Sequence, residues 1–234
     1  KNGALFRISA LRSEKIVTSS HYSRGAIQRH FGIPLDRIHV VPAAPDAFVD
    51  APDEAVAGLR AGRFAVYVSR FEPRKNQHAL VEAFDALKGT LDPDMKLVLV
   101  GYRALEYPEL DAAIAQAGER VLVLSNLSHA QLTWLYRHAA ASVYPSHAEG
   151  FGMPIIEAVA AGGASYCADN TAMSELVPYV DGKFAASDSE EIRATLSRVF
   201  EKAAPGGDMA TRNRMMEAFS WPASAHAFIE AIRD

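Results

Sequence analysis

The sequence predicts an α/β protein in which helices cover both faces of a parallel sheet. Short apolar runs alternate along the chain with longer segments in which apolar residues recur every three or four positions. A run that is apolar throughout is typical of a strand buried on both faces, and such strands belong to parallel sheets. The 234 residues are 49% hydrophobic and 22% charged, so the chain can bury a sizeable core.

The predicted elements follow one another along the chain. Strands are expected at residues 16–20, 37–42, 64–69, 96–100, 121–124, 141–145, 164–168 and 183–185. Helices are expected at residues 23–31, 76–88, 105–117, 128–139, 154–161, 190–202, 208–218 and 223–232. Ser128 and Gln131 have the spacing of a capping box at a helix start, and Pro154 suits the first position of the next helix. Residues 47–62 lack either periodicity and are expected to form a linker.

Composition excludes several classes of protein. A net charge of -4 gives no overall electrostatic reason to expect nucleic acid as a partner. Cys167 is the only cysteine, which rules out an internal disulfide and a cysteine-based zinc cluster. No apolar run approaches the roughly 20 residues that span a bilayer. We therefore expect a cytoplasmic location, and peripheral contact with the inner face of the membrane stays open.

A basic turn follows the strand at residues 64–69. In a parallel sheet, ligands bind at the carboxyl ends of the strands, where loops and helix starts present unpaired N–H groups. The turn contains Ser69, Arg70 and Lys75 just before a predicted helix. The guanidinium fork, the ammonium point charge and the helix start together suit a diphosphate. The alternative is an exposed basic turn paired with Glu72.

A glycine-rich run, E-G-F-G-M-P-I-I-E, follows the strand at residues 141–145 and extends from Glu149 to Glu157. Gly150 and Gly152 let the backbone approach a ligand closely, and the helix that starts at Pro154 directs N–H groups at the loop. Two carboxylates can each accept hydrogen bonds from neighbouring hydroxyls, as sugars and ribose offer. Either glutamate alone can be a charge at a helix start, but the whole run favours a sugar-nucleotide site.

These segments resemble the C-terminal part of the retaining family 4 glycosyltransferases. The resemblance rests on residues 68–76, 132–146 and 149–157, with support from residues 40–46, 174–176 and 219–221. It implies a GT-B fold, which has two Rossmann-like domains. Residues 1–46 would then be a remnant of the N-terminal acceptor domain with its linker, residues 47–220 the nucleotide-sugar-binding domain, and residues 221–234 a C-terminal crossover helix.

The resemblance also implies roles for individual residues. Arg70 and Lys75 would hold the donor diphosphate, Glu149 the hydroxyls of the transferred sugar and Glu157 those of the ribose. These assignments make Arg70, Lys75 and Glu149 the expected catalytic residues. The other expected donor-binding residues are Ser69, which stands where the family often has glycine, the sugar-lining Gly150, Phe151, Gly152 and Met153, and Leu124 and Leu127 beside the base.

The expected reaction is transfer of a sugar from a nucleoside diphosphate donor to a hydroxyl of a glycan or lipid-linked acceptor, with retention of configuration. GDP-mannose is favoured over UDP-sugars as the donor, and no cofactor or metal is expected. The acceptor would bind mainly to the missing N-terminal domain, so the isolated fragment is expected to be inactive. Three alternatives are a catalytically inactive nucleotide-binding or scaffolding module, a sugar-nucleotide epimerase and a phosphorylase. A dehydrogenase is disfavoured, because no G-x-G-x-x-G follows a strand.

Overall fold

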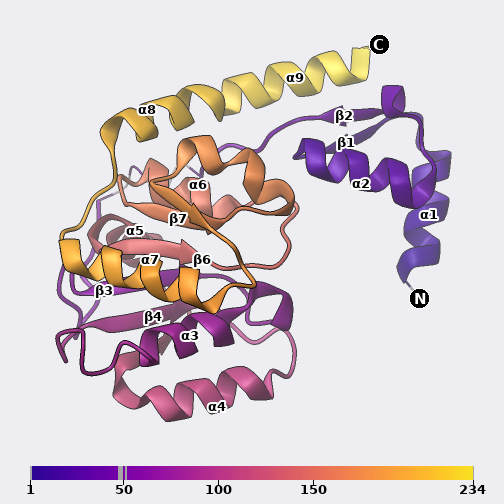
Figure 1. The fold of residues 1–234 in the computed structure, drawn as a ribbon. Coiled ribbons are helices and arrows are strands. Elements are labelled where there is room, and N and C mark those ends of the chain that lie inside the picture. The colour runs from indigo at the N-terminus through magenta and orange to yellow at the C-terminus, as the bar shows by residue number, and fades with distance from the viewer. Residues whose placement is uncertain (1, 47–49, 51, 234) are drawn as a thin grey trace.

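A parallel sheet of six strands forms the centre of the main domain (Figure 1). The computed structural model describes residues 2–46, 50 and 52–233, so the parts of the predicted segments at residues 1, 47–49, 51 and 234 lie outside the described residues. The strands are β3 (Phe64–Val68), β4 (Lys96–Val100), β5 (Val121–Leu124), β6 (Ala141–Tyr144), β7 (Ser165–Ala168) and β8 (Gly182–Phe184). Their order is β5-β4-β3-β6-β7-β8, and every pair is parallel. This is a doubly wound, Rossmann-like arrangement, and the predicted α/β class is confirmed.

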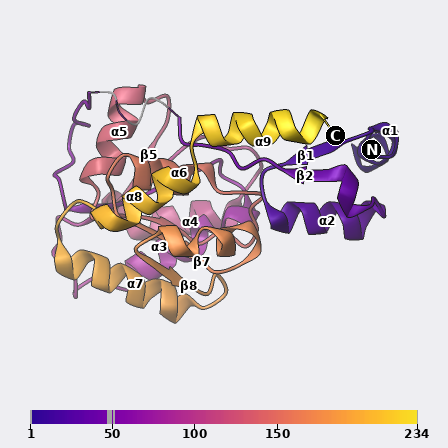
Figure 2. The same ribbon diagram turned by 90° about the horizontal axis from the view of Figure 1, so that it is seen from above.

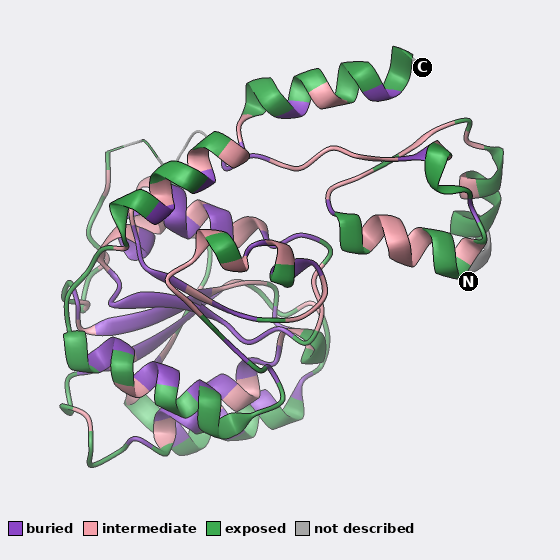
Figure 3. Ribbon diagram, turned by 45° about the horizontal axis from the view of Figure 1, so that its top comes forward, coloured by how far each residue is buried: buried purple, intermediate pink, exposed green. Residues whose placement is uncertain are grey.

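Two layers of helices cover the sheet, as Figure 1 shows. On one face α3 packs against α4 and α7, and on the other α6 packs against α5 and α8. The bounds of these helices are α3 (Gln77–Asp85), α4 (Pro108–Ala117), α5 (His129–His138), α6 (Met153–Ala160), α7 (Ser189–Lys202) and α8 (Met209–Ala218). In Figure 3 the strands of this sheet are mostly buried, whereas the outer faces of the helices are exposed.

The alternation of side chains along β3 explains why its sequence is apolar throughout. Phe64 and Val66 belong to a cluster with Trp134 of α5, and the rings of Phe64 and Trp134 stack with centroids 5.6 Å apart. Ala65 and Tyr67 belong to the larger cluster that includes the apolar face of α3. Because both faces of the strand are covered, neither face tolerates polar side chains.

Local chemistry moves three of the predicted helix starts. Asn76 adopts a left-handed conformation with φ 58°, so α3 starts at Gln77 and not at residue 76. The helix expected at residues 105–117 starts at Pro108, because the residue before a proline is disfavoured in helical conformation. The helix expected from Pro154 starts one residue earlier, at Met153, and the proline occupies its first turn.

A smaller unit precedes the main domain. It consists of α1 (Asn2–Arg12), β1 (Ile16–Thr18), α2 (His21–Phe31) and β2 (Ile38–Val40), and its two strands pair in parallel. The strands and α2 lie where the sequence predicts them, but α1 was not predicted. Its apolar residues are spread around the helix and are exposed instead of forming one buried stripe, namely Leu5, Phe6, Ile8 and Leu11.

The last helix, α9 (Trp221–Arg233), extends from the main domain to the smaller unit and lies alongside β1 and β2 in both Figure 1 and Figure 2. Trp221 Nε1 donates to the Pro45 carbonyl at 3.1 Å, and Ser224 Oγ donates to the Pro42 carbonyl at 2.6 Å. These bonds join the helix to the segment that connects the two units. The domain boundaries at residues 46 and 220 stay predictions.

The capping box at the start of α5 is present. Ser128 Oγ accepts from the Gln131 N–H, and the Gln131 side chain accepts from the Ser128 N–H, both at 3.1 Å. We expect Ser128→Ala to lower the free energy of unfolding by about 1 kcal/mol, because a helix-start N–H loses its acceptor. Urea denaturation of the variant measures this. The exposed Ser189 at the first position of α7 provides the control, and equal losses in Ser128→Ala and Ser189→Ala would contradict the capping role.

Candidate functional site

The order of the strands creates a topological switch point between β3 and β6. The chain runs from β3 outward to β4 and β5, then returns to β6 on the other side of β3. The loops that follow β3 and β6 therefore leave the same edge of the sheet in diverging directions, and such a switch point is where open α/β sheets bind ligands. The predicted basic turn is the first of these loops, and the predicted glycine-rich run belongs to the second.

Asn76 joins the two loops. Its side chain is 2% exposed, and its Nδ2 donates to the carbonyls of Pro145 and Ala186 at 3.2 and 2.9 Å. The His147 N–H donates to the Arg74 carbonyl at 2.9 Å, which adds a second link between the loops. Because a buried amide costs free energy unless it is hydrogen-bonded, these contacts fix the spacing of the two loops.

Lys75 and Glu149 form an ion pair at this switch point. Lys75 Nζ lies 2.5 Å from Glu149 Oε1, and the two side chains are only 13% and 14% exposed. Arg74 Nη1 lies 3.1 Å from the other carboxylate oxygen, Oε2. Arg74 was not predicted as a site residue, although it stands within the basic turn. A carboxylate that is so little exposed needs such partners, because an unpaired charge is costly away from water.

A chain of hydroxyl groups lies beneath this ion pair. Ser146 Oγ donates to Glu149 Oε1 at 2.8 Å, and the Tyr67 hydroxyl lies 2.8 Å from Ser146 Oγ and 2.9 Å from the Lys75 carbonyl. Burial raises the pKa of Tyr67 well above its ordinary value, so this hydroxyl keeps its proton and remains a donor. Tyr67 and Ser146 were not predicted, because each reads as an ordinary strand or loop residue.

Arg70 differs from Lys75 in that its side chain reaches solvent. The side chain is 53% exposed, and Nη2 lies 3.7 Å from Glu72 Oε1. The pairing of the basic turn with Glu72 that the sequence left as an alternative is therefore present. It is loose for the exposed Arg70, whereas Arg74 Nη2 lies 2.5 Å from the same Glu72 oxygen. Beside it, Gln77 Nε2 donates to Ser69 Oγ at 2.9 Å and to the Arg70 carbonyl at 2.8 Å. The backbone of the turn is thus held while the guanidinium stays accessible.

The loop after β6 is held in an unusual backbone conformation. The Glu149 N–H donates at 3.0 Å to the hydroxyl of Thr171, whose φ of 49° is rare for a β-branched residue. Gly152 has a φ of 120°, and a Cβ there would come within 2.9 Å of the Ile155 side chain. Phe151 is 8% exposed and packs against Phe219 with ring centroids 5.6 Å apart. The Phe151 side chain thus belongs to the core, and the backbone is what this loop offers to a ligand.

Glu157 lies on α6 and contacts α5. The Tyr136 hydroxyl donates to Glu157 Oε2 at 2.9 Å. Burial raises the pKa of Glu157 and the charge of Asp46 adds to this, whereas Tyr136 and His129 lower it, so that the net shift is upward. Leu124 and Leu127, which precede α5, pack against the apolar cluster of Trp134. The structure therefore pairs Lys75 with Glu149, and it places Glu157 beside Tyr136 of α5.

The raised pKa of Glu157 predicts a dependence of stability on pH. A carboxyl whose pKa is higher in the folded state contributes stability below its unfolded pKa, near 4.5, and this contribution is lost as the pH rises through the folded pKa. We expect Glu157→Gln to be more stable than the wild type at about pH 7 and equally stable at about pH 4, because the variant removes a buried charge. Urea denaturation at both pH values checks this, with the exposed Glu190→Gln as the control. A variant that is less stable at neutral pH would contradict it.

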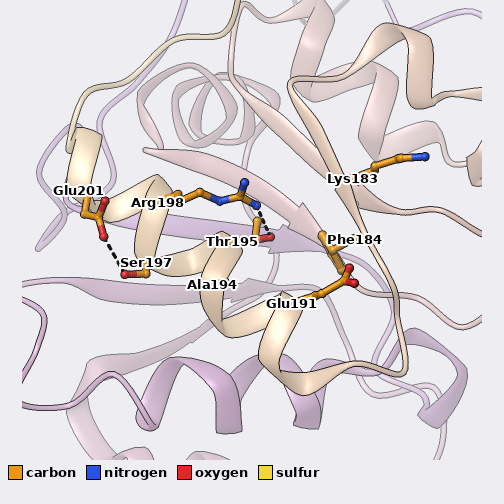
Figure 4. A pocket seen from close by; sticks show the side chains of 8 residues that line it. All are labelled: Lys183, Phe184, Glu191, Ala194, Thr195, Ser197, Arg198 and Glu201. Carbon is orange, nitrogen blue, oxygen red and sulfur yellow. Dashed lines mark hydrogen bonds between the residues drawn. The ribbon is translucent and has the colours of Figure 1, made fainter.

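A separate groove of about 490 Å³ lies beside β8 and α7, as Figure 4 shows. Its two cations already have partners, since Lys183 Nζ lies 2.6 Å from Asp169 Oδ2 and Arg198 Nη2 donates to Thr195 Oγ1 at 3.2 Å. It belongs to the outer strand of the sheet, away from the switch point between β3 and β6. Within residues 2–46, 50 and 52–233, no group of three or more metal-ligating side chains is present, and no helix is long and apolar enough to cross a membrane.

Comparison with known proteins identifies relatives. The O-antigen chain mannosyltransferase B of Escherichia coli is 31% identical over 223 residues, covering 88% of this chain and 57% of the relative. An MMP alpha-(1->4)-mannosyltransferase of Mycolicibacterium hassiacum is 30% identical over 220 residues, covering 90% and 52%. The chain thus spans about half the length of the curated relatives it matches.

Solved structures show the same fold. Sucrose-phosphate synthase from Thermosynechococcus elongatus superposes with a TM-score of 0.80 at 21% identity, covering 98% of this chain and 60% of that one. HepE from Anabaena, solved in complex with UDP and glucose, gives a TM-score of 0.79 at 19% identity, covering 94% and 63%. The family model described as "Glycosyl transferases group 1" matches residues 36–218, which is most of the chain. The chain therefore belongs to the group 1 glycosyl transferases, with the GT-B type of fold that its motifs predict.

Proposed function

We propose that this chain is the donor-binding part of a retaining glycosyltransferase, which moves a sugar from a nucleoside diphosphate to a hydroxyl acceptor in the synthesis of a glycan or glycolipid. The observation that carries this proposal is the Lys75–Glu149 pair at the switch point of the sheet, with the accessible Arg70 beside it. The cations suit the diphosphate, and the carboxylate suits the sugar hydroxyls.

In this proposal the cations stabilise the leaving group. Negative charge grows on the diphosphate as its bond to the sugar breaks, and fixed positive charges at that position lower the barrier. An ammonium group has three N–H donors, so Lys75 can contact a phosphate oxygen while it keeps Glu149. Arg70 supplies a second set of donors. The proposed mechanism needs no metal, because these side chains supply the positive charge.

The carboxylates orient the donor. Glu149 accepts hydrogen bonds from hydroxyls of the transferred sugar, and the backbone of residues 150–153 lines that sugar. Glu157 accepts from the ribose, and Leu124 and Leu127 flank the base. His129, the first residue of α5, lowers the pKa of Glu157, and this electrostatic contact supports the order, because the residues just before α5 are the ones proposed to meet the base.

Mannose is the sugar we propose, with GDP-mannose ahead of UDP-sugars as the donor. The names of the two mannosyltransferase relatives support mannose as the sugar. HepE, solved in complex with UDP and glucose, supports a site that takes a nucleotide together with a sugar.

We place the acceptor, a glycan or a lipid-linked glycan, mainly on a domain that precedes this chain in the whole protein. Without that domain this chain is expected to bind the donor but not to transfer the sugar. The proposal places the enzyme in the cytoplasm and leaves contact with the inner face of the membrane open.

Calorimetric titration of the chain with GDP and UDP tests the donor site. We expect the wild type to bind at least one of them, and Arg70→Ala and Glu157→Ala to lower the affinity about tenfold or more, because each loses a charge-assisted hydrogen bond. Arg193→Ala is the matched control, since Arg193 pairs with Glu190 on the exposed face of α7. A folded wild-type chain that binds neither nucleotide would refute the proposal.

A further inference from the structure

The smaller unit touches the proposed sugar-binding loop at a single carbonyl group. Ser20 Oγ donates to the Gly150 carbonyl oxygen at 2.7 Å, and Ser23 Oγ donates to the same oxygen at 3.1 Å. Ser20 is 1% exposed and is also the cap residue of α2, whereas Gly150 is exposed. Ser19 Oγ donates to this oxygen as well, at 3.4 Å. Three hydroxyl groups around the amino end of α2 thus converge on one loop carbonyl.

Glu175 holds that end of α2 in place. Its Oε2 accepts from the His21 N–H at 3.0 Å, and its Oε1 accepts from the Tyr22 N–H at 2.7 Å. These are first-turn amides, which have no acceptor within the helix, and a carboxylate is favoured there by the helix dipole. Both oxygens of Glu175 are therefore used to join two segments that are more than 150 residues apart in the sequence.

The segment that carries Glu175 also contacts the catalytic carboxylate residue. Glu175 ends the short helix Thr171–Glu175, and Thr171 at its other end accepts from the Glu149 N–H at 3.0 Å. One short segment thus contacts Glu149 at one end and α2 at the other. A pocket of about 480 Å³, whose walls include Phe151 and Glu175, lies beside this contact.

We propose that Glu175 is a positioning residue for the donor sugar. By holding α2 against the loop, it lets Ser20 and Ser23 fix the peptide group between Gly150 and Phe151. A trans peptide group is planar, with its C=O and N–H on opposite sides. The fixed carbonyl therefore directs the Phe151 N–H away from α2, as a backbone donor for a sugar hydroxyl. This inference rests on the proposed function, because it takes the loop to be the sugar-binding one.

Comparison of two ligands separates positioning from a general loss of structure. GDP lacks the sugar, and the cations and Glu157 that we assign to it lie outside the loop. We expect Glu175→Gln and Ser23→Ala to bind GDP within about twofold of the wild type and GDP-mannose about tenfold more weakly. Ser23→Thr keeps the hydroxyl and should restore the affinity for GDP-mannose. Glu190→Gln, on the exposed face of α7, is the control for the change of charge.

Two results would overturn the positioning role. One is an equal loss of affinity for GDP and GDP-mannose, which would indicate general damage to the domain, and the other is unchanged binding of both ligands. Amide hydrogen exchange then tests, without any ligand, whether Glu175 holds α2 and the loop together. We expect faster exchange at Tyr22 and at the 150–152 loop in Glu175→Gln, with no change at Val98 in the core. If the wild type binds neither ligand, the proposed function fails, but hydrogen exchange still tests whether Glu175 holds the loop.

Discussion

Replacement of Lys75 by methionine is expected to lower the rate of sugar transfer by a factor of about 10² to 10³, the usual effect of removing one fixed donor from the site of a developing charge. Methionine keeps much of the apolar stem of lysine but has no N–H donors. The variant therefore removes the charge nearest to Glu149, since Lys75 Nζ lies only 2.5 Å from that carboxylate. The loss should appear in kcat as well as in kcat/KM, because the charge on the leaving diphosphate grows in the transition state.

The measurement is steady-state transfer from GDP-mannose by the complete protein that contains this chain. Lys183→Met is the matched control, because Lys183 also pairs with a carboxylate, at 2.6 Å, but lies on the outer strand β8 with its side chain 56% exposed. We expect the control to stay within about twofold of the wild type, as for most exposed ion pairs. If Lys75→Met raised only KM, lysine would contribute equally to binding the donor and the transition state, and its proposed role in catalysis would be wrong.

A structural effect of the same substitution can be measured separately. Without Lys75, Glu149 keeps Arg74 and the Ser146 hydroxyl as partners, so the carboxylate is not left unpaired. The fold is therefore expected to survive, and circular dichroism of the variant checks it. This arrangement makes Lys75 a better site for mutation than Glu149, whose removal would leave two cations facing each other.

The sequence predicts the positions of the two loops well where the signal is local. The basic turn and the glycine-rich run each carry their chemistry within a few residues, and the rule that parallel strands end at the same edge brings them to one side of the sheet. The adjacency of β3 and β6 could not be predicted in the same way. It depends on the order in which the strands assemble, and no residue of either strand specifies that order alone.

The residues that support the site were missed for a related reason. Ser20 and Glu175 have ordinary local roles as a helix cap and a helix-end charge, and their contacts cross more than 120 residues of sequence. Thr171 adopts a left-handed φ of 49° in a position where sequence patterns favour glycine or asparagine. Such conformations occur where the surrounding structure forces them, and they concentrate at functional sites. A local sequence pattern does not reveal which residues the surrounding structure will hold in such a conformation.

The second large effect is expected at Gly101, where the chain turns at the end of β4. Gly101 has a φ of 149°, and a Cβ there would overlap the carbonyl oxygen of Ser69. The backbone of Ser69 cannot give way easily, because its N–H donates to the Val100 carbonyl at 2.9 Å and its side chain is held by Gln77. We therefore expect Gly101→Ala to lower the free energy of unfolding by about 3 kcal/mol or more, which combines overpacking with backbone strain.

Gly118→Ala separates these two contributions. Gly118 also has a positive φ, 61°, but a Cβ there would meet nothing within 4 Å. Only backbone strain remains, and with a ψ of -142° the expected loss is about 1 to 3 kcal/mol. Urea denaturation of both variants gives the difference, and equal losses would contradict the predicted overlap. Because Arg70 directly follows Ser69, Gly101→Ala should also weaken GDP binding under conditions where the variant is still folded, whereas Gly118→Ala should not. The glycine after β4 would then be required for the geometry of the proposed diphosphate site as well as for the fold.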